Sequence, residues 1–178
     1  MASTQVVKLG PCGGGGGSEK NMDSSSITRI VKISVRHGVA IDNFAVRFVR
    51  NGREESTEQW GGQGGNLTEF NLQSTEFITA VKGHYGNFNG NFVVRSLKFV
   101  TNLGTFGPYG QEEGVPFELP AINGQIIGFH GRSGQLLDSI GVYVKVGGSS
   151  GGGSGGSTGP GTWQTGDTNF WDRPVSGA

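Results

Sequence analysis

The chain has 178 residues, a length that suits one domain of ordinary size with a tail, and 35 of them are glycine. Its 14 basic and 14 acidic side chains cancel, so it lacks the basic surface by which proteins bind nucleic acid or an anionic membrane. The one cysteine, Cys12, excludes a scaffold held together by internal disulfides.

The N-terminal segment, residues 1–9, has one lysine and no apolar run of the length found in signal peptides. No other stretch approaches the roughly 18 consecutive apolar residues of a membrane-spanning helix. We therefore expect a soluble, cytoplasmic protein without membrane insertion.

Five segments alternate between apolar and polar residues with a period of two, which is typical of half-buried strands. They cover residues 30–36, 44–49, 96–100, 126–130 and 140–144. Gly, Asn or Asp separates them, and no apolar stripe has the 3.6-residue period of a helix. The pattern predicts an all-β domain of many antiparallel strands, as in a sandwich, a barrel or a prism.

The composition changes abruptly after Val146. Residues 147–161 contain nine glycines and four serines, which is the composition of a flexible linker. We therefore predict a domain over residues 1–146, the linker over 147–161 and a polar tail over 162–178. The tail is too short for a core of its own. It has three aromatic residues, Trp163, Phe170 and Trp171, and the sequence leaves open whether they dock on the domain, on a second copy or on nothing.

Two segments of the domain, residues 38–48 and 134–144, align with each other without gaps. Each starts with glycine, has aspartate four residues later (Asp42 and Asp138) and then enters an alternating strand. A third segment, residues 89–99, keeps the strand but has Val93 where the others have aspartate.

A glycine-rich turn is repeated as well. Residues 13–17 are all glycine and correspond to residues 61–65, which follow Trp60, and a weaker copy covers residues 106–110. Three units of a glycine turn and a strand–loop–strand predict pseudo-threefold symmetry, with three small sheets that bury their apolar faces against one another.

Three motifs carry a resemblance to a known family: Gly-Pro-Cys-Gly-Gly-Gly-Gly-Gly at 10–17, Tyr109-Gly110 with Gly-Val-Pro-Phe at 114–117, and the segment 127–143. Over about residues 4–146 the chain resembles the jacalin-related lectins. The resemblance implies a β-prism of three four-stranded Greek-key sheets. It also implies the mannose-specific branch, whose members are single chains that often form homodimers or homotetramers.

The family's sugar site combines the last glycine of the first glycine turn with a Gly-x-x-x-Asp loop. Carried onto this sequence, the first site consists of Gly17, Gly134, Gln135, Leu136 and Asp138. A second site, found in some members, consists here of Gly65, Gly38, Val39, Ala40 and Asp42. The third unit lacks the aspartate, so no third site is expected. Cys12 departs from the family, where tryptophan is common at that position, and this change implies altered packing beneath the first glycine turn.

These residue types suit a hexose, whose hydroxyl groups both donate and accept hydrogen bonds. A carboxylate accepts from two neighbouring hydroxyls, backbone N–H groups of the loop donate whatever the side chains are, and glycine lets the main chain come close to the sugar ring. We therefore predict a non-catalytic lectin for mannose- or glucose-type glycans and glycoproteins, without metal or other cofactor.

In relatives, the loop that corresponds to residues 84–89 lies beside the first site and shapes its selectivity. His84, Tyr85 and Phe88 are therefore candidate selectivity residues, with Phe88 as an aromatic platform for a second sugar ring. Packing of Phe88 in the core is the structural alternative.

Catalysis and metal binding fit the sequence less well than sugar binding does. A glycoside hydrolase needs paired carboxylates about 5–10 Å apart, and the adjacent pairs at 54–55 and 112–113 fit solvated charge better. His37, His84 and His130 stand alone, without ligands at metal-binding spacing. A protein interaction or assembly module on a lectin-like scaffold remains the alternative function.

Overall fold

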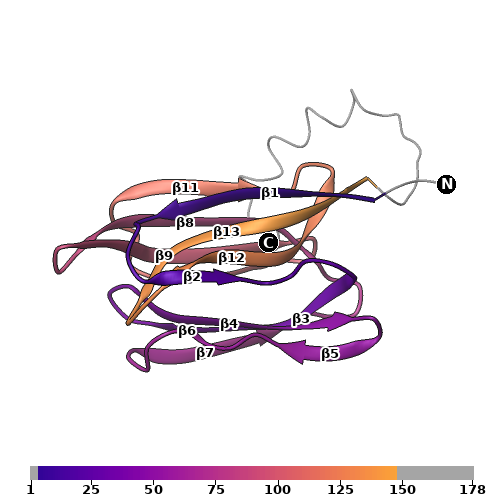
Figure 1. Cartoon of the computed structure of the whole chain (residues 1–178). Coiled ribbons are helices and arrows are strands. Elements are labelled where there is room, and N and C mark those ends of the chain that lie inside the picture. Colours follow the sequence, from indigo (N-terminus) through magenta and orange to yellow (C-terminus); the bar gives the residue numbers. More distant parts are fainter. Residues whose placement is uncertain (1–3, 148–178) are drawn as a thin grey trace.

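A computed structural model describes residues 4–147, and this part of the chain contains strands and their connections but no helix (Figure 1). Accordingly, no helix long and apolar enough to cross a membrane occurs in residues 4–147. Gly147, the first residue of the predicted linker, ends the last strand, and the rest of the linker and the tail lie outside the described residues. The strands are β1 (Thr4–Gly13), β2 (Ser18–Asn21), β3 (Ile27–His37), β4 (Ile41–Arg50), β5 (Arg53–Ser56), β6 (Trp60–Gly61), β7 (Asn66–Asn71), β8 (Ile78–Phe88), β9 (Asn91–Thr101), β10 (Thr105–Gly110), β11 (Val115–Pro120), β12 (Gly124–Ser133) and β13 (Leu137–Gly147).

The strands form three groups around one core. The first sheet has the order β1–β13–β12–β2, and the third has the order β10–β9–β8–β11. In the second sheet, β7–β3–β4 is completed by β5 and β6, which follow one another along the edge of β4. One residue pair, Ile126 with Ile78, joins the first sheet to the third. The predicted β-prism is confirmed.

Each sheet is built on a central hairpin: β12–β13, β3–β4 and β8–β9. In the second and third sheets, the chain continues beside the second hairpin strand and then returns beside the first, which is a Greek key. In the first sheet, β1 and β2 from the N-terminal end take these edge places. The two ends of the domain therefore share one sheet (Figure 1).

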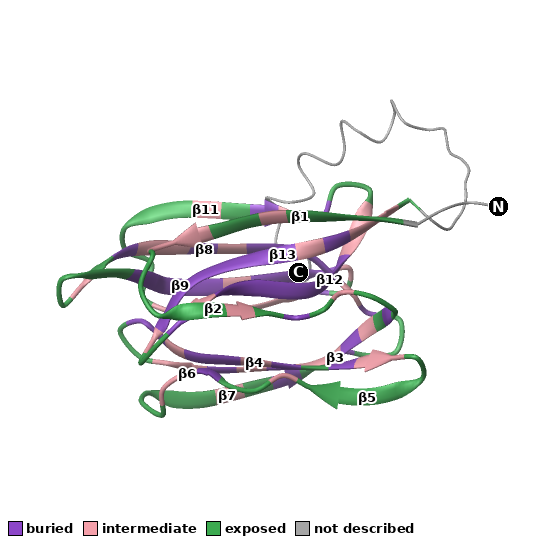
Figure 2. Ribbon diagram, viewed as in Figure 1, coloured by how far each residue is buried: buried purple, intermediate pink, exposed green. Residues whose placement is uncertain are grey.

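Buried residues lie on strands of all three sheets (Figure 2), and most of them are large and apolar. The ring of Phe44 lies 6.1 Å from that of Phe99, 4.9 Å from that of Phe129 and 5.8 Å from that of Trp60. Full burial of such a side chain stabilises a fold by about 1.5–3 kcal/mol. The three sheets thus share one core, which fixes the relative positions of the loops at their ends.

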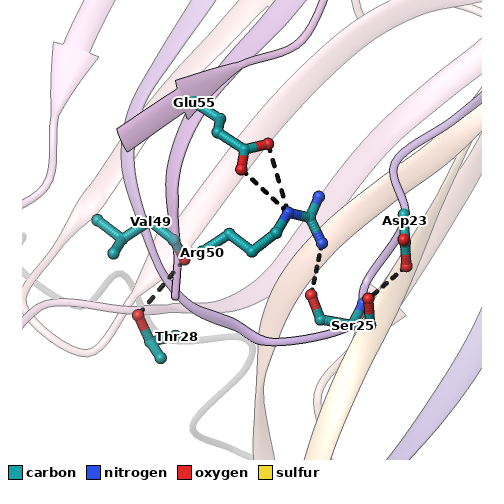
Figure 3. A network of polar contacts seen from close by, with 6 residues as sticks. All are labelled: Asp23, Ser25, Thr28, Val49, Arg50 and Glu55. Carbon is teal, nitrogen blue, oxygen red and sulfur yellow. Dashed lines mark hydrogen bonds and ion pairs between the residues drawn. The ribbon is translucent and has the colours of Figure 1, made fainter. Parts of the chain in front are cut away.

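A polar network holds the connections at one end of the prism (Figure 3). Arg50, the last residue of β4, forms an ion pair with Glu55 and donates a hydrogen bond to the carbonyl oxygen of Ser25, in the β2–β3 connection. The backbone N–H of Ser25 in turn donates to Asp23 over 3.0 Å. The β3–β4 and β12–β13 loops lie at the opposite end, where the candidate site residues are found.

Candidate functional site

The first glycine turn and the 134–136 loop meet at the start of β13. The turn connects β1 to β2, and the N–H of Gly14 donates to the carbonyl oxygen of Asp138 over 2.8 Å. The loop connects β12 to β13 and is closed by a 3.0 Å hydrogen bond from the N–H of Gly134 to the carbonyl oxygen of Leu136. Asp138, the second residue of β13, lies between the two.

Two glycines of this turn, Gly16 and Gly17, lie close against the carboxylate of Asp138. A Cβ atom at Gly16 would lie 2.7 Å from Oδ2 of Asp138, and one at Gly17 would lie 2.7 Å from Oδ1 and 2.4 Å from the carbonyl oxygen of Ser133. Gly17 also has a φ of 67°, which disfavours other residues. Exposed backbone of the turn and of the loop therefore surrounds the buried Asp138, and the five residues predicted for the first site lie together.

The second unit repeats this arrangement in detail. The N–H of Gly62 donates to the carbonyl oxygen of Asp42 over 2.9 Å, as Gly14 does to Asp138. A Cβ atom at Gly64 would lie 2.8 Å from Oδ2 of Asp42, and one at Gly65 would lie 2.6 Å from Oδ1. The loop is closed by the bond from Gly38 N–H to Ala40 O, again over 3.0 Å. The residues predicted for the second site are thus together too.

Burial raises the pKa of both carboxyl groups. For Asp138 the loss of water contact is partly offset by a hydrogen bond from the Gly134 backbone and by Arg132, both of which lower the pKa. For Asp42 the same loss of solvation is partly offset by His37 and Arg36.

Two arginines that the motif analysis missed support the glycine turns. Arg132 donates to the carbonyl oxygens of Gly16 and Gly17 over 3.0 and 2.8 Å. Arg36 donates to those of Gln63 and Gly65 over 3.4 Å each. Each arginine stands two residues before the first glycine of its loop, so extending the repeat alignment upstream by two residues would have found both.

In the third unit, the residue equivalent to the aspartates is Arg95, and the alignment with Val93 is wrong. The carbonyl oxygen of Arg95 accepts a 2.9 Å hydrogen bond from the N–H of Gln111, as those of Asp138 and Asp42 do from their glycine turns. The gapless alignment was shifted because the β8–β9 hairpin is longer, with pairing that continues to Phe88–Asn91 around a tight turn. The aspartate is absent from the third unit, as expected.

The predicted selectivity residues do not all lie together. His84 bonds the hydroxyl of Ser96 over 3.0 Å and lines a groove over β8, β9 and β11 with Lys98 and Phe117. Tyr85 has its ring 6.5 Å from that of Phe92, and the ring of Phe88 lies 5.4 Å from the guanidinium carbon of Arg95.

The residue of this hairpin nearest the first glycine turn is Phe92, which the sequence analysis did not select. A Cβ atom at Gly14 would lie 2.1 Å from its carbonyl oxygen, and the side chain of Phe92 is 55% exposed. The β8–β9 hairpin thus lies against the first glycine turn through Phe92, and the selectivity role of His84, Tyr85 and Phe88 stays a prediction.

The three units contact one another in a ring at this end of the prism. Phe92 of the third unit lies against Gly14 of the first, and Gln135 of the first lies against Gly62 of the second, where a Cβ atom would be 2.6 Å from the Gln135 carbonyl oxygen. The ring closes where Val39 of the second unit accepts a hydrogen bond from Arg95 of the third. Each loop thus depends on its neighbouring unit as well as on its own.

No group of three or more His, Cys, Asp or Glu residues within residues 4–147 is placed to hold a metal ion. Each aspartate stands among backbone groups with one arginine nearby, an arrangement that offers hydrogen bonds to a neutral polar ligand.

Comparison with known proteins agrees with this geometry. The jacalin-like lectin domain matches residues 9–143. Horcolin from Hordeum vulgare is 40% identical over 144 residues, which cover 79% of this chain and 98% of horcolin.

Solved structures give the same result. A mannose-binding jacalin-related lectin from Ananas comosus superposes with a TM-score of 0.75 at 39% identity, covering 78% of this chain and 96% of its own. A mannose-specific jacalin-related lectin from Morus nigra, in complex with mannose, has a TM-score of 0.73 at 37% identity, with coverage of 82% and 98%. The chain belongs to the jacalin-related lectins, a family of carbohydrate-binding proteins without catalytic activity.

Proposed function

We propose that this lectin binds mannose- and glucose-type glycans reversibly and without metal, at two sites per chain. The observation that carries the proposal is the duplicated contact of one carboxylate with two glycines: Asp138 with Gly16 and Gly17, and Asp42 with Gly64 and Gly65. A packing role alone would not require both turns to expose their backbone around a half-buried or buried carboxylate.

The chemistry of each site fits a pyranose ring. The carboxylate accepts hydrogen bonds from two neighbouring hydroxyls, and each such bond to a charged group contributes roughly 1.5–3 kcal/mol. The loop supplies backbone donors, Gln135 and Leu136 N–H at the first site and Val39 and Ala40 N–H at the second. The choice of mannose over galactose is supported by the relatives, several of which are named for mannose binding.

Calorimetric titration tests the proposal directly. We expect methyl-α-mannoside to bind with a stoichiometry near two per chain in the presence of EDTA, and methyl-α-galactoside to give no saturable heat. A stoichiometry of one would remove the second site, and binding lost with EDTA would exclude metal independence. No heat with either sugar would favour the interaction-module function instead.

The raised pKa values predict how binding depends on pH. A protonated carboxyl group loses acceptor capacity, so affinity is complete at neutral pH and falls as the pH drops through the pKa of the folded protein. Because burial raises the pKa of Asp138 and Asp42, the fall begins at a higher pH than for an ordinary aspartate, whose pKa is about 3.9. Titrations between about pH 4 and pH 7 measure it, and affinity unchanged over that range would contradict the assignment of the carboxylates.

We also propose that the chain forms homodimers or homotetramers. Shallow sites bind single sugars weakly, and several sites in one assembly raise the avidity for a glycoprotein. The strand β1 supports this, since within residues 4–147 it lies at the edge of its sheet and pairs with β13 alone, and Val6 and Val7 are 43% and 38% exposed. Light scattering measures the molar mass of the assembly in solution.

The cytoplasmic location stays a prediction, which cell fractionation tests.

A further inference from the structure

Arg95 is a buried arginine that belongs to the third unit but contacts the second. Arg95 is only 8% exposed. It occupies the position in the third unit that Asp138 and Asp42 occupy in the other two units. In that place the third unit has no carboxylate to bind a ligand. Its guanidinium instead extends to the 38–40 loop, where Nε donates to the carbonyl oxygen of Val39 over 3.0 Å.

The rest of the guanidinium is held by the third unit itself. Nη1 donates to the carbonyl oxygen of Asn87 over 3.0 Å, and Nη2 donates to side-chain oxygens of Gln111 and Glu113 over 3.2 Å each. The ring of Phe88 packs 5.4 Å from its central carbon. With these groups fixed in one plane, the direction of the Nε–H bond is fixed as well.

The bond to Val39 determines the orientation of the next N–H group. The carbonyl of Val39 and the N–H of Ala40 belong to the same planar peptide and point in opposite directions. Ala40 is only 1% exposed, so this peptide has little room to turn and the direction of its N–H follows that of the Val39 carbonyl. At the first site, the equivalent carbonyl is that of Gln135, which lies against the backbone of Gly62 of the second unit.

We propose that Arg95 is a positioning residue for the second sugar site: it holds the Val39–Ala40 peptide so that the Ala40 N–H points to the sugar. This inference rests on the proposed function, because it requires the second site to bind sugar. It also gives the third unit a role: residue 95, which is arginine where the other two units have aspartate, supports the sugar site of the second unit.

The test uses two parent proteins that separate the sites. Asp138→Asn leaves only the second site, and Asp42→Asn leaves only the first. Lysine at position 95 keeps the charge but lacks the planar fork that makes four bonds at once. We expect Arg95→Lys to weaken methyl-α-mannoside binding about tenfold in the Asp138→Asn parent, and by less than about twofold in the Asp42→Asn parent.

Glu113→Gln is the matched control, because glutamine keeps an oxygen that accepts from Nη2 of Arg95, the side chain of Glu113 is 63% exposed, and the bonds to Asn87 and Gln111 still hold the guanidinium. We expect its second-site affinity to change by less than about twofold. A general loss of stability would weaken both sites together, so equal weakening in the two parents by Arg95→Lys would overturn the positioning role. Unchanged second-site affinity would overturn it too.

A second measurement needs no substitution at Arg95. The Nε–H resonance of Arg95 should shift when mannoside saturates the Asp138→Asn parent and stay in place when it saturates the Asp42→Asn parent. No shift in the first case would overturn the assignment of Arg95. If the Asp138→Asn parent shows no saturable binding, the second site itself is wrong. If that parent binds mannoside and the Arg95 resonance does not move, only the role of Arg95 is wrong.

Discussion

Substitution Asp138→Asn should remove the first sugar site and lower the calorimetric stoichiometry from two to one. Asparagine keeps the shape of the side chain but exchanges one acceptor oxygen for a donor and removes the charge. Loss of one charged hydrogen bond weakens binding by at least about tenfold, and loss of two by more, which takes the affinity of a weak sugar site below detection. Asp42→Asn should do the same at the second site, and the double variant should not bind.

The fold should survive the same substitution. Burial raises the pKa of Asp138, so the folded protein holds this proton more tightly than the unfolded chain does. The contribution of this group to stability is therefore complete below its pKa in the unfolded chain and is lost as the pH rises through its higher pKa in the folded protein, so burial of the ionised form disfavours the fold at neutral pH. We expect the Asp138→Asn protein to unfold at the parental temperature or slightly above it, as measured by calorimetry.

Asp23→Asn is the control, since Asp23 is an exposed carboxylate in the β2–β3 connection at the other end of the prism (Figure 3). It should leave both stoichiometry and affinity unchanged. A double variant Asp42→Asn/Asp138→Asn that still binds mannoside with parental affinity would show that the sites lie elsewhere.

Most of the fold could be predicted because strand patterns and repeats are local. The five predicted strands all lie inside longer strands of the structure: β3, β4, β9, β12 and β13. The predictions missed β8, whose Gly83 and Gly86 interrupt the apolar alternation. Gly83 is required by packing, since a Cβ atom there would lie 2.3 Å from the Ser96 carbonyl oxygen and 2.8 Å from the Phe117 ring, a contact between strands that no local pattern reveals.

In the candidate site, too, the residues that follow a repeated pattern could be predicted and those positioned by contacts between units could not. Gly17, Gly65 and the two Gly-x-x-x-Asp loops could be found because they recur at matching places in two units. Arg95 could not, because the longer β8–β9 hairpin shifts its place by two residues and its contact with Val39 joins positions 56 residues apart. Side chains that act between units depend on the closed ring of three, which exists only after the sheets have packed.

Substitution Gly17→Ala should weaken the first site by at least about tenfold and lower the free energy of unfolding by about 1–3 kcal/mol. Two causes act together. The φ of 67° costs an alanine about 1 kcal/mol, and its Cβ atom would lie 2.4 Å from the Ser133 carbonyl oxygen and 2.7 Å from Oδ1 of Asp138. The turn has to move away from β12, and the carboxylate moves with it or turns away from the sugar.

Gly15→Ala in the same turn separates this effect from a general sensitivity of the glycine run. A Cβ atom at Gly15 would have no neighbour within 4 Å, and its φ lies outside the left-handed region, so affinity and stability should stay at the parental values. Gly65→Ala should repeat the loss at the second site, where a Cβ atom would lie 2.6 Å from Oδ1 of Asp42. Chemical denaturation and titration of the three variants measure both effects. Equal behaviour of Gly15→Ala and Gly17→Ala would mean that the turn is only a flexible connection, whereas a loss confined to Gly17→Ala and Gly65→Ala would tie sugar binding to the contact between backbone and carboxylate.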